Sequence, residues 1–280
     1  MGREVVNIGA EMMERPIGVF DSGVGGLTVV SELFRILPQE DIIYFGDTAH
    51  LPYGSKSKQA VTRFSLDIAN FLKAQKVKII VVACNTASSF ALSSLREKID
   101  LPVIGVIEPG AQAAISTTRN LKIGIIGTEG TIKSRAFEEA VKRMDRNVKV
   151  FSQACPLFVP LVEEGWLDEP ETSQIAKKYL SSLKNKGIDT LILGCTHYPL
   201  LKVLLSRIMG QEVSLIDTAE AMAKAVESRL GEKNLLRKGN RKAIYKFFVS
   251  DDPEKFLQLG RKFLGKSMDK AERVDLEVME

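Results

Sequence analysis

Short apolar runs alternate along the chain with longer segments in which apolar residues recur every three or four positions. The short runs have the length of buried strands, and the longer segments have the period of amphipathic helices. This alternation predicts repeated βα units, and hence an α/β fold with mainly parallel sheets covered by helices. The expected strands are 17–20, 41–46, 78–84, 102–108, 121–127, 148–153, 189–195, 212–217 and 244–250.

One helix can be placed from its periodicity alone, between Ser57 and Gln75. Its apolar residues recur at offsets of three, four or seven positions, and its remaining positions are largely polar. The apolar positions are Val61, Phe64, Ile68, Phe71 and Leu72. Such spacing predicts a surface helix with one buried stripe.

The two halves of the chain resemble each other weakly. The segment "IGVFDSGVGGLT" at 17 recurs as "IGIIGTEGTIKS" at 123, and "PVIGVIEPG" at 102 corresponds to "EVSLIDTAE" at 212. Between these pairs, Cys84 of "VVACNTAS" aligns with Cys195 of "LILGCTHYP". Three matches in the same order at nearly constant offset indicate an internal duplication.

The duplication predicts two similar α/β domains related by approximate twofold symmetry, with a cleft between them. The chain is expected to cross between the domains near Glu108 and Asp217. Residues from 218 onward should return to the first domain, because the strand at 244–250 needs a sheet to join. The expected domains are 1–108 together with 218–280, and 109–217. The charge-rich segment 266–280 is expected to be a frayed tail.

Charge and hydropathy exclude two classes of partner. The 39 basic and 35 acidic residues give a net charge of +4, which is too evenly mixed for a nucleic-acid-binding face. The basic cluster at 237–242 is expected to form a solvated loop. No apolar run reaches the roughly 18 residues of a membrane span, and the first 16 residues lack the apolar core of a secretory signal. We therefore expect a cytoplasmic protein with no nucleic acid or membrane partner.

The three cysteines, Cys84, Cys155 and Cys195, include no C-x-x-C pair. An odd number without that spacing argues against a disulfide framework and against a thiolate metal site. Reduced thiols are therefore expected, with no metal. Cys155 lies in an apolar context without a counterpart in the repeat, and is expected to be a buried structural thiol.

Cys84 and Cys195 each follow a predicted strand, at the edge of a parallel sheet where ligands bind. The polar residues after each cysteine can cap a following helix, whose positive end would favour a thiolate. A single cysteine at a strand end is more often a small hydrophobic residue of the core. The duplicated placement favours reactive thiols, which the approximate symmetry would bring face to face across the cleft.

Other polar residues gather near these positions. The segment "FDSGVGGLT" predicts a glycine-rich pocket for anionic groups, with Asp21 as acceptor or base. It departs from a dinucleotide-binding pattern, because Thr28 stands where the third glycine belongs. His197, two residues after Cys195, has a functional interpretation at least equal to a structural one. His50 is expected to be a solvated loop residue.

The acidic pair Glu163 and Glu164 follows the apolar run "CPLFVPLV". One carboxylate could point into the cleft while the other meets solvent. Charge at a helix end is usually only solvation, so the pattern by itself leaves both interpretations open.

Taken together, these motifs resemble the glutamate racemases of the cofactor-independent aspartate/glutamate racemase family. The resemblance covers nearly the whole chain after the first 15 residues, and the "CTHYP" form favours the glutamate members over the aspartate ones. No function is carried onto the residues before Arg15 or after about Gly265. The segments that carry it are "IGVFDSGVGGLTV", "YFGDTAHLPYG", "VVACNTASS", "PVIGVIEPG", "ACPLFVPLVEEG", "LILGCTHYPLL" and "FFVSDDPEKF".

The resemblance implies proton transfer at the α-carbon of glutamate by two cysteines on opposite faces. Cys84 is expected to deprotonate D-glutamate and Cys195 L-glutamate. Asp21 would support Cys84, and His197 with Glu163 would assist Cys195. The implied substrate-binding residues are Asp21, Ser22, Tyr53, Gly54, Asn85, Thr86, Thr196 and His197.

The resemblance also implies that neither pyridoxal phosphate nor a metal is required, that the protein forms a homodimer, and that D-glutamate is supplied for peptidoglycan. Three alternatives stay open from the residues. The first is a racemase for aspartate or another amino acid that uses the same thiols. The others are a thiol-disulfide oxidoreductase and an amino-acid-binding protein without catalysis.

Overall fold

The computed structural model describes residues 10–239, 241–265 and 268–276. Its strands are β1 (Ile17–Asp21), β2 (Ile42–Gly46), β3 (Ile79–Val82), β4 (Val103–Gly105), β5 (Lys122–Gly127), β6 (Lys149–Ala154), β7 (Thr190–Gly194), β8 (Ser214–Asp217), β9 (Tyr245–Val249) and β10 (Glu272–Arg273). Its helices are α2 (Leu27–Ile36), α3 (Lys58–Ala74), α4 (Asn85–Lys98), α5 (Ile107–Thr117), α6 (Glu129–Ser134), α7 (Ala136–Met144), α8 (Phe158–Glu164), α9 (Pro170–Asn185), α10 (Lys202–Met209), α11 (Thr218–Glu232) and α12 (Pro253–Leu264), with 3-10 turns η1 (Tyr53–Ser55) and η2 (Tyr198–Leu201).

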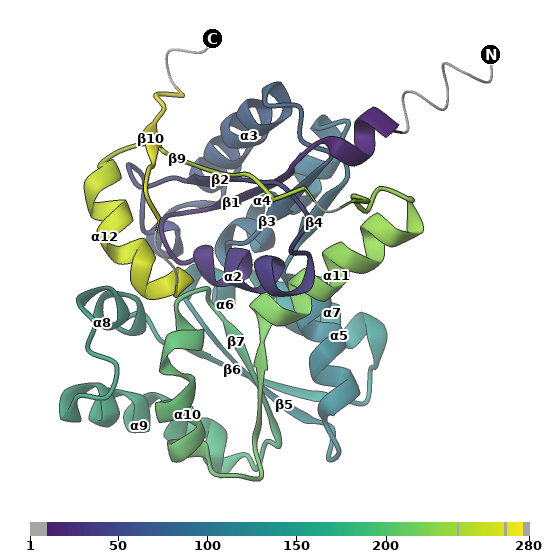
Figure 1. The fold of residues 1–280 in the computed structure, drawn as a ribbon. Helices are drawn as coiled ribbons and strands as arrows, with labels where there is room; N and C mark the ends of the chain where they lie inside the picture. Colours follow the sequence, from purple (N-terminus) through teal and green to yellow (C-terminus); the bar gives the residue numbers. More distant parts are fainter. Residues whose placement is uncertain (1–9, 240, 266–267, 277–280) are drawn as a thin grey trace.

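The strands form two parallel sheets, one above the other in Figure 1. The first sheet has the order β10-β9-β2-β1-β3-β4, and the second has the order β6-β5-β7-β8. The four strands β2-β1-β3-β4 therefore repeat in the same spatial order as β6-β5-β7-β8. This repetition confirms the expected α/β architecture built from two similar halves. The domain boundaries at 108 and 217 stay a prediction.

The central strands read as continuous apolar runs because helices cover both faces of each sheet. All residues of β1, β3 and β7 are buried. The helix expected at 57–75 is α3, and Ser57 caps it by accepting the Ala60 N–H at 3.2 Å. Its apolar stripe faces the core, as the periodicity predicted.

Two expectations are wrong in detail. The run 102–108 is a strand only as far as Gly105, because the Val106 N–H donates to the Ser88 hydroxyl (3.3 Å) instead of a neighbouring strand, and α5 follows. The C-terminal segment is not frayed where the structure describes it. Strand β10 pairs with β9, and Val274 donates its N–H to the Val249 carbonyl at 2.8 Å.

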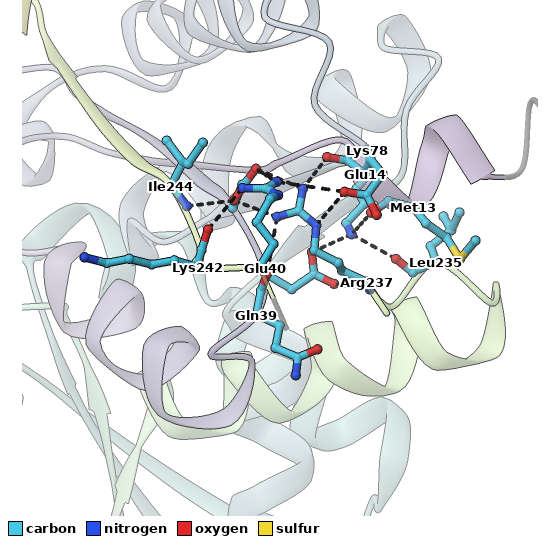
Figure 2. Close-up of polar contacts among 11 residues, drawn as sticks. Met13, Glu14, Gln39, Glu40, Lys78, Leu235, Arg237, Lys242 and Ile244 are labelled. Atoms are coloured by element: carbon cyan, nitrogen blue, oxygen red, sulfur yellow. Dashed lines mark hydrogen bonds and ion pairs between the residues drawn. The ribbon is translucent and has the colours of Figure 1, made fainter. Parts of the chain in front are cut away.

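A buried cluster of charges ties together the amino-end edge of the first sheet (Figure 2). The Lys78 ammonium, whose side chain is fully buried, donates to Glu40 (2.5 Å) and to the carbonyls of Met13 (2.9 Å) and Leu235 (2.8 Å). Its three donors thus have three acceptors. The second Glu40 oxygen accepts the Arg237 N–H at 2.8 Å. The cluster therefore joins four segments that are distant in sequence.

We expect Lys78→Met to destabilise the protein by about 3–5 kcal/mol, because it leaves the Glu40 carboxylate buried without its cation. The free energy of unfolding from urea titration measures this loss. Lys73→Met is the matched control, since Lys73 also makes a short ion pair, with Asp100 (2.8 Å), but is exposed. That variant should change the free energy by no more than about 1 kcal/mol. Equal losses in the two variants would contradict the assignment.

Candidate active site

The carboxyl ends of the two sheets meet around a small cavity of about 30 Å³, which both Cys84 and Cys195 line. Cys84 follows β3, and Cys195 follows β7, the equivalent strand of the second sheet. The structure therefore brings the two cysteines of the duplicated motif to one site. Every other predicted site residue except Asp21 also lines this cavity. These are Ser22, Tyr53, Gly54, Asn85, Thr86, Glu163, Thr196 and His197.

Cys84 is itself the N-cap residue of α4. Its sulfur accepts the Ala87 N–H at 3.4 Å and lies 3.7 Å from the Ser22 hydroxyl oxygen. We expected the polar residues after Cys84 to cap this helix, and that expectation is wrong. The thiol takes the cap position because its backbone is extended there while the next residue is already helical.

Asn85 and Thr86, which do not cap α4, line the cavity instead. The Asn85 side chain is buried, and neither its amide nitrogen nor its oxygen has a hydrogen-bond partner among the described residues. The Thr86 hydroxyl lies 2.9 Å from that of Thr128 and 3.1 Å from that of Thr131. Because unpaired buried polar groups cost free energy, the Asn85 amide is suited to binding a polar ligand.

Cys195 has different surroundings from Cys84. Its sulfur lies 3.9 Å from His197 Nδ1, and the chain continues as the 3-10 turn η2 before α10 begins at Lys202. The expectation that an α-helix begins directly after this thiol is therefore wrong. An imidazole stands beside Cys195, where an α-helix N-terminus stands beside Cys84.

The His197 ring is buried and held on three sides. Its Nε2 lies 3.0 Å from Glu163 Oε1, and the ring edge packs against Phe263 of α12 at 5.2 Å between centroids. On the third side, a Cβ built on Gly25 would lie 2.5 Å from Nδ1, so only glycine fits there.

Of the predicted acidic pair, Glu163 lines the cavity and Glu164 is exposed.

Burial dominates the ionisation of both thiols. It raises the pKa of Cys84 to about 12, against the opposing effect of the Ala87 N–H and the Ser22 hydroxyl. Burial also raises the pKa of Cys195, although a hydrogen bond from the backbone N–H of His197 opposes the rise. The net lowering expected from helix ends is therefore not found, because desolvation of a thiolate outweighs a few hydrogen bonds.

Cys155 is fully buried and does not line the cavity. Burial raises its pKa, with no hydrogen bond or charge to oppose the shift. It is the structural thiol that its apolar context predicted.

Asp21 lies behind the cavity wall and is fully buried. Its Oδ2 accepts the N–H groups of Gly23 (3.3 Å) and Gly26 (3.0 Å), and its Oδ1 lies 3.5 Å from the Thr196 hydroxyl. The glycine-rich loop was expected to hold an external anion, but the Asp21 carboxylate occupies these donors itself. Burial raises the pKa of Asp21, and the nearby His197 opposes the rise.

Sequence patterns missed several residues of the cavity wall. Thr128, the N-cap of α6, lines the cavity and is the counterpart of Ser22 in the internal repeat, so the duplication could have identified it. Val159 of α8 adds an apolar contact that no motif announced. Leu51 was not singled out either, whereas the remaining lining residues, Gly23 and Pro52, lie in the predicted glycine-rich pocket and in the turn that carries Tyr53 and Gly54.

Neither a metal-binding group nor a membrane-spanning helix occurs among the described residues. Within 10–239, 241–265 and 268–276, no three His, Cys, Asp or Glu side chains gather in a group that could hold a metal ion. In the same ranges no helix combines the length and the apolar character that crossing a bilayer needs.

Known proteins are similar to this chain in sequence and in fold. A family model described as Asp/Glu/Hydantoin racemase matches residues 17–226. A glutamate racemase from Geobacter metallireducens is 52% identical over 263 residues, which cover 94% of this chain and 97% of that protein.

Solved structures agree with this match. A glutamate racemase isoform from Bacillus anthracis has a TM-score of 0.91 at 43% identity, covering 94% of this chain and 98% of that one. A glutamate racemase from Francisella tularensis in complex with D-glutamate has a TM-score of 0.89 at 42% identity, covering 95% and 99%. Because the family model matches residues 17–226 and these relatives align with more than nine tenths of the chain, the chain belongs to the Asp/Glu/Hydantoin racemase family.

Proposed function

We propose that this protein is a glutamate racemase, which interconverts L- and D-glutamate by proton transfer at the α-carbon. The observation that carries the proposal is the pair of thiols from a duplicated motif that line one cavity. Inversion needs an acid and a base on opposite faces, because a single base returns the proton to the face it came from. Relatives at about half identity are glutamate racemases, which favours glutamate over aspartate or another amino acid.

In the proposed reaction the two cysteines exchange roles with direction. Cys84 as thiolate removes the α-proton of D-glutamate, and the C–H electron pair stays on the substrate as a carbanion stabilised by its carboxylate. The Cys195 thiol then gives its proton to the opposite face, forming the new C–H bond and leaving a thiolate. Cys195 starts the reverse reaction from L-glutamate.

His197 and Glu163 are proposed to activate Cys195. A carboxylate only accepts hydrogen bonds, so the Glu163 contact assigns the proton of the ring to Nε2. Nδ1 is then left as an acceptor, and it faces the Cys195 sulfur at 3.9 Å. The imidazole can therefore take the thiol proton and return it, which offsets the cost of ionising a buried sulfur.

Cys84 is proposed to be activated by donors instead of a base. The Ala87 N–H donates to its sulfur, and the positive end of α4 adds to this donor. The Cys84 thiol donates to the Ser22 hydroxyl oxygen, and that hydroxyl can donate in return once the thiol has lost its proton. Asp21 supports Cys84 indirectly, because its carboxylate holds the loop that carries Ser22.

Polar groups around the thiols are proposed to bind the substrate. The Asn85 amide and the Thr86 hydroxyl, with the N–H groups at the start of α4, suit one carboxylate. The cavity wall formed by Tyr53 and Gly54 suits the other, and Ser22, Thr196 and His197 also line the cavity. Asp21, predicted as a substrate contact, lies behind the wall and is not placed to touch the substrate. A cavity of about 30 Å³ has room for only two or three waters, so the cavity must widen to admit glutamate.

Four further properties belong to the proposal. The thiols supply both proton donor and acceptor, so we expect no need for pyridoxal phosphate or a metal. We also expect a homodimer, a cytoplasmic location and a role in supplying D-glutamate for peptidoglycan, as the family resemblance implies.

Incubation of the protein with L-glutamate in D2O, after dialysis against chelator and without added cofactor, should give D-glutamate carrying deuterium at Cα. The second thiol exchanges its proton with solvent, so the proton it delivers is a deuteron. Polarimetry and proton NMR measure the two events. A thiol-disulfide oxidoreductase would incorporate no deuterium, and a binding protein would retain glutamate without turnover.

Cys84→Ala and Cys195→Ala should each lower the rate of racemisation by about 10²–10⁴-fold, because each removes one of the two proton-transfer groups. Cys155→Ala is the matched control, since that thiol is buried outside the cavity and should leave the rate within about threefold. Full activity in either of the first two variants would refute the two-thiol assignment.

The kcat/KM for racemisation should rise with pH by up to about tenfold per unit between about pH 6.5 and 8.5. In this range each thiol is mainly protonated, since burial raises the pKa of Cys84 to about 12, and the thiolate fraction increases with pH below the pKa. L- and D-glutamate have equal free energy, so the equilibrium constant is one. The kcat/KM must therefore be the same in both directions at every pH. A profile that falls over this range would contradict the thiolate base.

A further inference from the structure

A buried carboxylate outside the cavity organises the loop that forms one of its walls. Asp47 follows β2 and is only 1% exposed. Its Oδ2 accepts the Tyr53 hydroxyl at 2.5 Å, and its Oδ1 accepts the Ser250 hydroxyl at 2.7 Å. His50 Nδ1 completes the set at 2.9 Å. Three side chains from two distant parts of the chain therefore converge on one carboxylate.

The residue on the inner side of this carboxylate belongs to the cavity wall. Tyr53 is 1% exposed and lines the cavity together with Gly54. Burial, with the Asp47 charge, raises the pKa of Tyr53 well above its usual value, so its hydroxyl stays protonated and donates. Because a phenol has one proton, that donation to Asp47 sets the direction of the Tyr53 side chain.

The same loop has no free space on its other side. A Cβ built on Gly54 would lie 2.6 Å from Thr128 of the second half. The loop is thus held between Asp47 behind it and Thr128 in front of it. A shift at Asp47 must therefore move Tyr53 and Gly54 relative to the opposite wall.

The outer side of the carboxylate faces a second, larger cavity of about 830 Å³, which His50, Asp47 and Ser250 line. His50 was expected to be a solvated loop residue. The structure instead stacks its ring on Phe64 at 3.9 Å between centroids, with about a third of the side chain exposed. Asp47 thus lies between this outer cavity and the wall of the reaction cavity.

We propose that Asp47 is a positioning residue for substrate binding, which acts through the Tyr53 hydroxyl on the Tyr53–Gly54 wall. This inference rests on the proposed racemase function. Asp47 does not line the reaction cavity, so it affects the affinity for glutamate by setting the geometry of residues that do. A second link supports the role, because the Asp47 N–H donates to the Asp21 carbonyl at 3.0 Å.

Tyr53→Phe removes only the hydroxyl that reaches Asp47. We expect it to raise the KM for glutamate by about 10–100-fold, as a displacement of a binding group by about 1 Å would, with kcat changed much less. Ser250→Ala removes another donor to Asp47 without touching the reaction cavity, and should raise KM by a smaller factor. Calorimetric titration with D-glutamate should show the same ratios in Kd, independently of turnover.

Thr48→Val is the matched control for stability. Thr48 belongs to the same loop, and its hydroxyl exchanges two hydrogen bonds with the backbone of Asp251. The side chains that reach the Asp47 carboxylate are instead those of His50, Tyr53 and Ser250. It should lower Tm as Ser250→Ala does while leaving KM unchanged. If Tyr53→Phe and Ser250→Ala also leave KM and Kd unchanged, Asp47 is only structural and the inference fails. Absence of racemisation by the unaltered protein would instead reject the proposed function.

Discussion

Burial of two thiols in one small cavity is the constraint on which the rest of the site depends. Cys84 follows β3 of one sheet and Cys195 follows β7 of the other, and the carboxyl ends of the two sheets face one cavity, so the two thiols meet away from water. Desolvation then holds both in the neutral form. A protein that uses them as bases must supply, within the cavity, the stabilisation that water would have given to a thiolate.

In the proposed reaction the two halves supply that stabilisation by different means, although both carry the repeated cysteine motif. Around Cys84 the stabilising groups are donors, with the sulfur in the N-cap position of α4. Beside Cys195 the chain forms a 3-10 turn, and the His197 imidazole takes the equivalent place with Glu163 behind it. The symmetry therefore extends to the positions of the sulfurs, and not to the groups that support them.

The residues that stabilise the fold and the residues proposed to take part in the reaction lie at opposite edges of the first sheet. Its amino-end edge carries the charge cluster around Lys78, in which each donor of the ammonium has an acceptor. Its carboxyl-end edge carries Asn85, whose buried amide has no partner, and a wall held by Asp47. The buried Lys78 ammonium, which only holds the fold, thus has all its hydrogen bonds made, whereas the buried Asn85 amide, which faces the cavity, has none among the described residues.

The strands, the duplication and the paired cysteines follow from the sequence, because apolar periodicity and repeated motifs are local properties. Tertiary structure alone decided that the thiol caps α4, that Asp21 occupies its own glycine loop, and that the C-terminal segment adds β10. These outcomes depend on contacts between residues far apart in sequence. The same holds for Asp47, whose partner Ser250 lies 203 positions away, beyond any local pattern.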